Sequence, residues 1–151
     1  MNNPKHSILI VEDEPVDAEL LERSFKQLGL MNPLHWVTNG EEAVRYIEGR
    51  GEFQDRAIHP FPRVIITDIK MPEMTGLELL RWMHANPKYR VVPVVVFTSS
   101  VRQSDVDEAF NYGASAYIAK PIGLAELNRA VKIIVDYWSL SLLPSISEQV
   151  Q

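Results

Sequence analysis

The sequence predicts an α/β fold, a doubly wound flavodoxin-like sandwich with a five-stranded parallel sheet between helices. Short apolar, β-branched runs alternate with segments of helical period along the chain. Runs that are apolar on both faces are typical of parallel strands covered by helices. With 151 residues, 46% of them hydrophobic, the chain is long enough for one substantial core and too short for two. We therefore expect a single domain over 1–151, with a core over about 6–139 and a tail over 140–151.

The first half of the chain begins with a strand over 7–11. Pro15 is well placed at the first position of the helix that follows, which Gly29 ends. The apolar stripe of this helix is Val16, Leu20, Leu21, Phe25 and Leu28. A second strand is expected over 34–37, and Asn39-Gly40 leads into a helix with apolar residues Ala43, Val44 and Ile47. The stretch 49–62 contains two Gly and two Pro and is predicted to be an extended connection.

The second half continues the alternation, with strands expected over 63–67, 92–97 and 116–119. A helix beginning at Gly76 separates the first two of these strands. Ser104-Asp105 is a plausible N-terminal cap for the next helix, which Gly113 ends. The last helix runs from Leu124 to about Ser139, and its apolar positions are Leu127, Val131, Ile134 and Trp138.

Composition excludes several classes of function. A formal net charge of -5 without a dense Lys/Arg run argues against binding to a nucleic-acid backbone. The absence of cysteine excludes disulfides, thiolate metal sites and a catalytic thiol. No apolar run is long enough to span a bilayer, and residues 1–6 lead into a strand rather than a signal peptide. We expect a cytoplasmic protein that binds neither nucleic acid nor membrane.

Polar side chains follow four of the predicted strands: Asp13, Asp68, Thr98 and Lys120. The carboxyl ends of parallel strands meet at one edge of the sheet, where ligands of open α/β sheets bind. Two carboxylates, a hydroxyl and an ammonium gathered there would suit a divalent cation and a phosphoryl group.

In these motifs the chain resembles the receiver domain of two-component response regulators. The resemblance rests on 11–13 (VED), 68–76 (DIKMPEMTG), 97–100 (FTSS), 113–114 (GA) and 117–121 (YIAKP), in family order and spacing. It covers nearly the whole chain and implies the strand order 2-1-3-4-5. The long loop, residues 131–138 and the short tail are more specifically similar to stand-alone receivers that pair with bacteriophytochrome-like histidine kinases.

The resemblance implies that Asp68 is the phosphoacceptor, whose carboxylate attacks the phosphorus of a phosphohistidine and becomes an acyl phosphate. Glu12, Asp13 and Asp68, with the backbone carbonyl of Lys70, would hold Mg²⁺. Taken alone, Glu12 is more simply a solvated acid near a helix start, and Asp68 an ordinary carboxylate at a strand end. The motif around each residue favours the functional interpretation.

The family also implies roles for residues beside the acceptor. Lys120 would pair with Asp68 and later with the phosphoryl group, and its bond to Pro121 would be cis. Thr98 would bind a phosphoryl oxygen while Tyr117 turns inward, the Thr/Tyr switch of the family. Lys70 and Ser100 occupy positions that influence the lifetime of the acyl phosphate, and a long cation at Lys70 predicts slow hydrolysis.

The histidines and the apolar residues near the C-terminus are assigned no chemical role. His6, His35, His59 and His84 lack metal-ligand spacing. Four apolar residues lie near the C-terminus: Trp138, Leu140, Leu142 and Leu143. They either close the core or extend an apolar surface patch through which a homodimer forms, and both interpretations stay open.

The sequence thus predicts a single-domain response regulator that is phosphorylated on Asp68 by a sensor histidine kinase and signals by protein contact, with no separate enzymatic output. One alternative is a phosphorelay intermediate that passes the group to a histidine phosphotransfer protein. A more distant one is a binding module that does not depend on phosphorylation, although such a pseudo-receiver is expected to lose an acid or the lysine. A haloacid-dehalogenase-type phosphohydrolase would need a second Asp where Lys70 stands.

Overall fold

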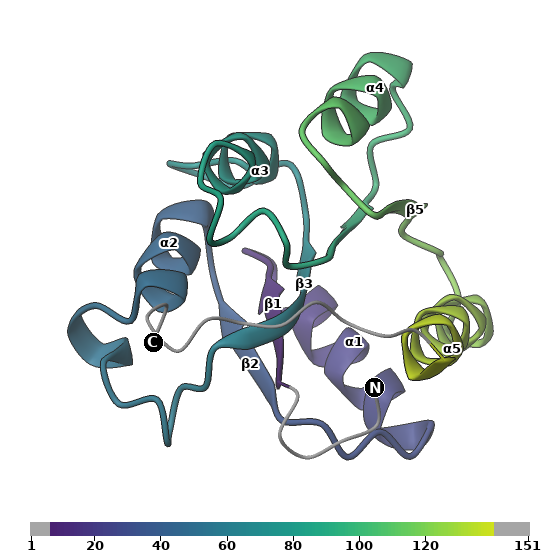
Figure 1. The fold of residues 1–151 in the computed structure, drawn as a ribbon. Coiled ribbons are helices and arrows are strands. Elements are labelled where there is room, and N and C mark those ends of the chain that lie inside the picture. The colour runs from purple at the N-terminus through teal and green to yellow at the C-terminus, as the bar shows by residue number, and fades with distance from the viewer. Residues whose placement is uncertain (1–6, 141–151) are drawn as a thin grey trace.

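The computed structural model describes residues 7–140 and consists of a parallel five-stranded sheet with helices on both faces (Figure 1). The strand order is β2-β1-β3-β4-β5, so both the predicted fold class and the predicted order are confirmed. The bounds are β1 Ser7–Val11, β2 Leu34–Val37, β3 Pro62–Thr67, β4 Val94–Thr98 and β5 Ala116–Ala119. β1, β3 and β4 are paired on both sides, which explains why they are almost wholly buried.

The helices form two layers (Figure 1). α1 and α5 cover one face of the sheet, and α2, α3 and α4 cover the other. Their bounds are α1 Pro15–Gln27, α2 Gly40–Glu48, α3 Gly76–His84, α4 Gln103–Asn111 and α5 Leu124–Leu140. Each layer has its own apolar core against the sheet, one around Phe25 and Val131, the other around Tyr46 and Leu80. Trp138 is buried in the first of these cores, whereas residues 141–151 lie outside the described part of the chain.

Two predicted boundaries were wrong for local reasons. β4 begins at Val94 rather than Val92, because the Val92 N–H closes a turn onto the Tyr89 carbonyl and Pro93 has no N–H to give. α4 begins one residue before Ser104, and its N-cap, Arg102, makes no side-chain capping bond. The carboxylate of Asp105 accepts a hydrogen bond from the Ser100 hydroxyl instead (2.6 Å).

The long connection between α2 and β3 is more ordered than its Gly and Pro content predicts. It contains a short 3₁₀ helix, η1 (Gly51–Phe53). The guanidinium of Arg56 donates to the carbonyls of Tyr46 (2.8 Å) and Ile47 (2.6 Å) in the last turn of α2, where the Tyr46 carbonyl also accepts from the Gly49 N–H (3.1 Å). This arginine therefore fastens the loop to the helix.

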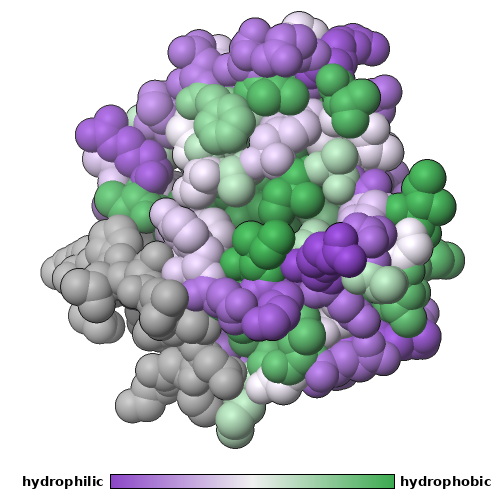
Figure 2. Space-filling model, turned by 90° about the vertical axis from the view of Figure 1, so that its right-hand side faces the viewer, coloured by the Kyte–Doolittle hydropathy of each residue, from purple (hydrophilic) through white to green (hydrophobic). Residues whose placement is uncertain are grey.

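The face formed by β5 and α5 carries an apolar hollow of about 160 Å³. Figure 2 shows this side of the molecule, with hydrophobic residues gathered in its middle. The lining residues are Ser115, Ala116, Ile118, Ile133, Ile134, Tyr137 and Trp138. The expected homodimer through the C-terminal apolar residues stays a prediction. Over residues 7–140, the helices are too short or too polar to cross a membrane.

Candidate functional site

Three carboxylates meet at the carboxyl edge of the central strands. Glu12 and Asp13 follow β1, and Asp68 follows β3, its neighbour in the sheet. One carboxylate oxygen from each lies within 4.8 Å of the other two, and Glu12 and Asp68 are buried. Within residues 7–140 this is the one group of three or more acidic or histidine side chains arranged to hold a metal ion. Oxygen donors at this spacing fit a hard divalent cation, which would relieve their mutual repulsion.

The ammonium of Lys120 lies against this cluster. Its Nζ is 2.6 Å from Oε1 of Glu12 and 2.8 Å from Oδ2 of Asp68. Lys120 directly follows β5, and its N–H donates to the Thr98 carbonyl (2.8 Å), which fixes the start of the side chain relative to β4. The side chain of Lys120 is only 12% exposed, so water screens these ion pairs weakly.

The pKa values of the site reflect this arrangement. Burial raises the pKa of Glu12 above its usual range, although the hydrogen bond from Lys120 opposes the shift and the charge of Asp68 reinforces it. For Lys120, burial lowers the pKa, but hydrogen bonds to Asp68, Glu12 and Asp17 outweigh it, so the pKa lies above its ordinary value. Lys120 is therefore a permanent cation at neutral pH.

Backbone contacts hold Asp68 in place. Its N–H donates to the carbonyl of Val11 (3.0 Å), and its Oδ1 accepts from the N–H of Ile69 (2.6 Å). Gly76 opens α3 directly against this segment, since a Cβ atom at Gly76 would lie 2.0 Å from the carbonyl oxygen of Asp68. Only glycine permits this approach, and the turn 68–76 closes with the Gly76 N–H donating to Ile69 (2.9 Å).

The predicted switch residues meet through Ser100. Thr98 is buried at the end of β4, and its hydroxyl accepts from the Ser100 N–H (3.3 Å). The hydroxyl of Tyr117, a half-buried residue of β5, donates to the Ser100 carbonyl (2.9 Å). The β4–α4 loop thus connects the threonine beside the site with the tyrosine.

The peptide bond between Lys120 and Pro121 differs from the expectation. No cis bond occurs in the described part of the chain, so this bond is trans. Trans is the favoured form of an X–Pro bond by about 0.5–1 kcal/mol. Pro121 is partly exposed and Ile122 fully so, so packing in this loop does little to offset that preference.

One site residue carried no signal in the sequence. Asp17, in the first turn of α1, accepts a hydrogen bond from Nζ of Lys120 at 2.9 Å. A polar residue on the outer face of an amphipathic helix is ordinary, so only the fold shows that it faces the lysine. Lys70 is exposed in the loop after Asp68, and the use of its carbonyl as a metal ligand stays a prediction.

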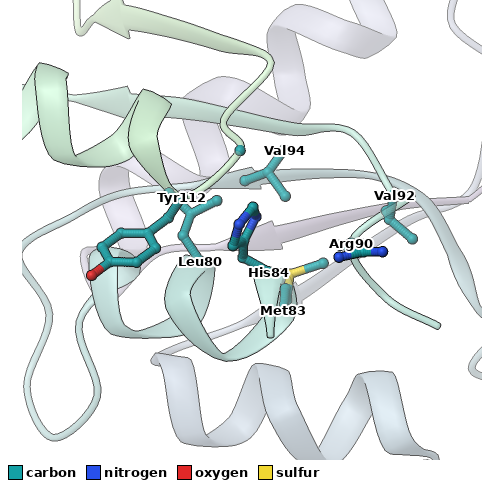
Figure 3. Close-up of a pocket in the computed structure, with 8 residues that line it drawn as sticks. Leu80, Met83, His84, Arg90, Val92, Val94 and Tyr112 are labelled. Carbon is teal, nitrogen blue, oxygen red and sulfur yellow. The ribbon is translucent and has the colours of Figure 1, made fainter. Parts of the chain in front are cut away.

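His35, His59 and His84 lie away from the carboxylates, and His6 lies outside the described residues. His35 and His59 belong to an aromatic cluster with Tyr46. His84 lines a small hollow with Arg90, Val92 and Tyr112, and Figure 3 shows its ring pointing into this space. Val92 precedes β4 whereas Thr98 ends it, so this hollow lies toward the opposite edge of the sheet from the site.

Comparison with known proteins agrees with the fold. Residues 8–132 match the model of the response regulator receiver domain. The chain therefore belongs to this family and is related to the response regulators of two-component signalling.

Particular relatives narrow the comparison. The probable methanogenesis regulatory protein FilR2 of Methanothrix harundinacea is 32% identical over 87% of this chain and 82% of its own length. Response regulator Rcp1 of Synechocystis is 29% identical over 91% of each chain, and its Mn²⁺-bound structure superposes with a TM-score of 0.84 at 28% identity (93% of this chain, 99% of that one). The phosphorylated cyanobacterial phytochrome response regulator RcpA gives the same values of TM-score, identity and coverage.

Proposed function

We propose that this protein accepts a phosphoryl group from a sensor histidine kinase onto Asp68 and signals by a change of conformation and contact with a partner protein. The observation that carries the proposal is the meeting of Lys120 with Asp68 beside the carboxylate cluster. A nucleophilic carboxylate, a cation for the phosphoryl oxygens and oxygen ligands for a metal are the parts that phosphoryl transfer needs. The domain over 1–151 is proposed to act as a receiver.

The transfer is a displacement at phosphorus. An oxygen of Asp68 forms the new bond to phosphorus, while the bond from phosphorus to the histidine nitrogen of the donor breaks. The nitrogen keeps the electron pair of that bond and takes up a proton. Lys120 and Thr98 would then contact the phosphoryl oxygens, and the strong hydrogen bonds of the ammonium would stabilise their charge.

Glu12, Asp13 and Asp68, with the carbonyl of Lys70, are proposed to hold Mg²⁺. Bound there, the ion would neutralise phosphoryl oxygens whose charge otherwise repels the attacking carboxylate. The carboxylates fit this role because they supply hard oxygen donors from two adjacent strands. The Mn²⁺-bound form of the relative Rcp1 supports a divalent cation in a protein of this kind.

Movement of Thr98 toward the phosphoryl group would carry the signal. The Ser100 N–H bonds to the Thr98 hydroxyl, and the Ser100 carbonyl accepts from Tyr117. A shift of Thr98 would therefore alter the contact that holds Tyr117. The face of α4, β5 and α5 would present the change to a partner. Kinship with RcpA supports a phytochrome-like histidine kinase as the phosphodonor.

Intact-mass measurement after incubation with a small phosphodonor tests this function. We expect one added phosphoryl group that requires both Mg²⁺ and Asp68, and that is absent from Asp68→Asn. No adduct under any condition would favour a binding module that does not depend on phosphorylation. Transfer from the phosphorylated protein to a histidine phosphotransfer protein would instead identify a phosphorelay intermediate.

A further inference from the structure

Asp17 is the third carboxylate on Lys120 and differs from the other two. Nζ of Lys120 contacts Glu12, Asp17 and Asp68 at 2.6, 2.9 and 2.8 Å. Glu12 and Asp68 also belong to the carboxylate cluster that fits a metal ion, and Asp17 does not. The side chain of Asp17 is 38% exposed, against 5% for Glu12 and 9% for Asp68. Asp17 therefore lies at the rim of the site, with the ammonium between it and the cluster.

A divalent cation in the cluster changes what Lys120 can pair with. The oxygens of Glu12 and Asp68 would ligate a bound cation, whose charge would repel the ammonium of Lys120. Asp17, which lies outside the carboxylate cluster, would then remain as a partner of Lys120. Its place is favourable for an anion, because α1 begins at Pro15 and the N-terminal end of a helix stabilises negative charge.

We propose that Asp17 is a positioning residue for Lys120: it draws the ammonium away from Glu12 and keeps it within reach of Asp68. The proposal rests on the proposed function of the site. In the metal-free protein Lys120 bridges all three acids, and in the metal-bound protein Asp17 becomes its main partner. Asp17 thereby eases metal binding, since without it Lys120 competes with the cation for Glu12 and Asp68.

A double-mutant cycle separates this effect from simple charge, because the loss of any nearby carboxylate weakens cation binding. The variants are Asp17→Asn, Lys120→Met and the double mutant. Glu19→Gln is the matched control, since it removes the same charge from the same helix at an exposed residue paired with Arg23. Mg²⁺ binding can be followed by NMR through the indole N–H of Trp36, which donates to the Glu12 carbonyl at 2.7 Å.

We expect Asp17→Asn to weaken Mg²⁺ binding about fivefold in the native background and less than about twofold in the Lys120→Met background. Glu19→Gln should change Mg²⁺ binding by less than about twofold, as expected of an exposed charge that solvent screens. Equal factors for Asp17→Asn in both backgrounds would overturn the proposal, because the effect would then not act through Lys120. An effect of Glu19→Gln on Mg²⁺ binding as large as that of Asp17→Asn would also overturn the proposal.

A crystal structure of the native protein with Mg²⁺ tests the geometry without any variant, in case Lys120→Met does not fold. Nζ of Lys120 should remain in hydrogen-bond distance of Asp17 and leave Glu12. An ammonium that stays on Glu12, or that leaves Asp17, would contradict the proposal. Neither measurement needs phosphorylation, so failure to phosphorylate Asp68 would end the proposed function while these results still decide the role of Asp17.

Discussion

The ammonium of Lys120 lies 2.8 Å from a carboxylate oxygen of Asp68, although 52 residues separate the two in the chain. The parallel sheet produces this contact, because β3 and β5 both end at its carboxyl edge on either side of β4. The pair also has two further acids within reach, Glu12 and Asp17. A carboxylate with its own cation is thus placed at the carboxyl edge of the sheet.

Gly76→Ala should destabilise the protein by about 3 kcal/mol, because the new Cβ would overlap the carbonyl oxygen of Asp68 and force the buried turn apart. Urea denaturation measures the change. Gly123→Ala is the control, since a Cβ there meets nothing within 4 Å, and its effect should stay within about 1 kcal/mol. Similar losses of stability for the two variants would show that the turn at Gly76 accommodates a Cβ atom with little cost.

Tyr117→Phe should remove the hydrogen bond to the Ser100 carbonyl and cost about 1 kcal/mol of stability in the unphosphorylated protein. Urea denaturation measures this loss of stability. NMR should show shifted amide resonances in the β4–α4 loop of the variant. An unchanged spectrum of that loop would mean that Tyr117 does not hold it, and the proposed link between Thr98 and the surface would fail.

Lys70→Asn should shorten the lifetime of the acyl phosphate about tenfold, as expected from the loss of one charge-assisted hydrogen bond to the phosphoryl group. Lys70 is exposed beside the acceptor, so its long side chain can reach over the site. The decay of the phosphorylated protein followed by intact mass gives the lifetime. Lys88→Asn removes an exposed lysine between α3 and β4 and should leave the lifetime as it is. Equal lifetimes for Lys70→Asn and the native protein would refute the role of Lys70.

The stability of the protein should fall below about pH 6.5 partly through His35. Burial, with a contribution from the charge of His59, lowers the pKa of His35 below its ordinary value of 6.5. The folded state then binds fewer protons than the unfolded state, so this contribution is present above pH 6.5 and is lost as the pH falls below it. Urea denaturation at pH 7.5 and 5.5 should show that the free energy of unfolding falls less on acidification in His35→Gln than in the native protein. An identical loss in both proteins would argue against the shift.

The sequence predicted much of the fold because periodicity and strand ends are local properties. The apolar runs before Glu12 and Asp68 marked β1 and β3, and the carboxyl-edge rule then brought their acids together. Strand order came from family resemblance rather than from periodicity. Val16 was placed on the apolar stripe of the first helix, yet 66% of its surface is exposed, since α1 presents a narrower face to the sheet than the pattern suggested.

Asp17 and Arg56 escaped prediction because their roles depend on long-range contacts. Asp17 meets a lysine 103 residues away, and no spacing in α1 signals it. Arg56 lies in a loop whose composition indicated an irregular connection, yet its guanidinium closes the end of α2. The bond before Pro121 is trans, the form that an X–Pro bond favours, and the Lys-Pro motif alone does not specify a cis bond.

The central claim is that Asp68 itself carries the phosphoryl group, and chemical mapping of the phosphorylated protein tests it most directly. Borohydride reduces an acyl phosphate on aspartate to homoserine, which peptide mass spectrometry locates. The account predicts homoserine at position 68 in protein treated with a small phosphodonor and Mg²⁺, and none without Mg²⁺. Homoserine at Asp13 or Asp17 with position 68 unmodified would contradict the account. So would the one-carbon-longer alcohol that the same reduction gives from a glutamyl phosphate at Glu12.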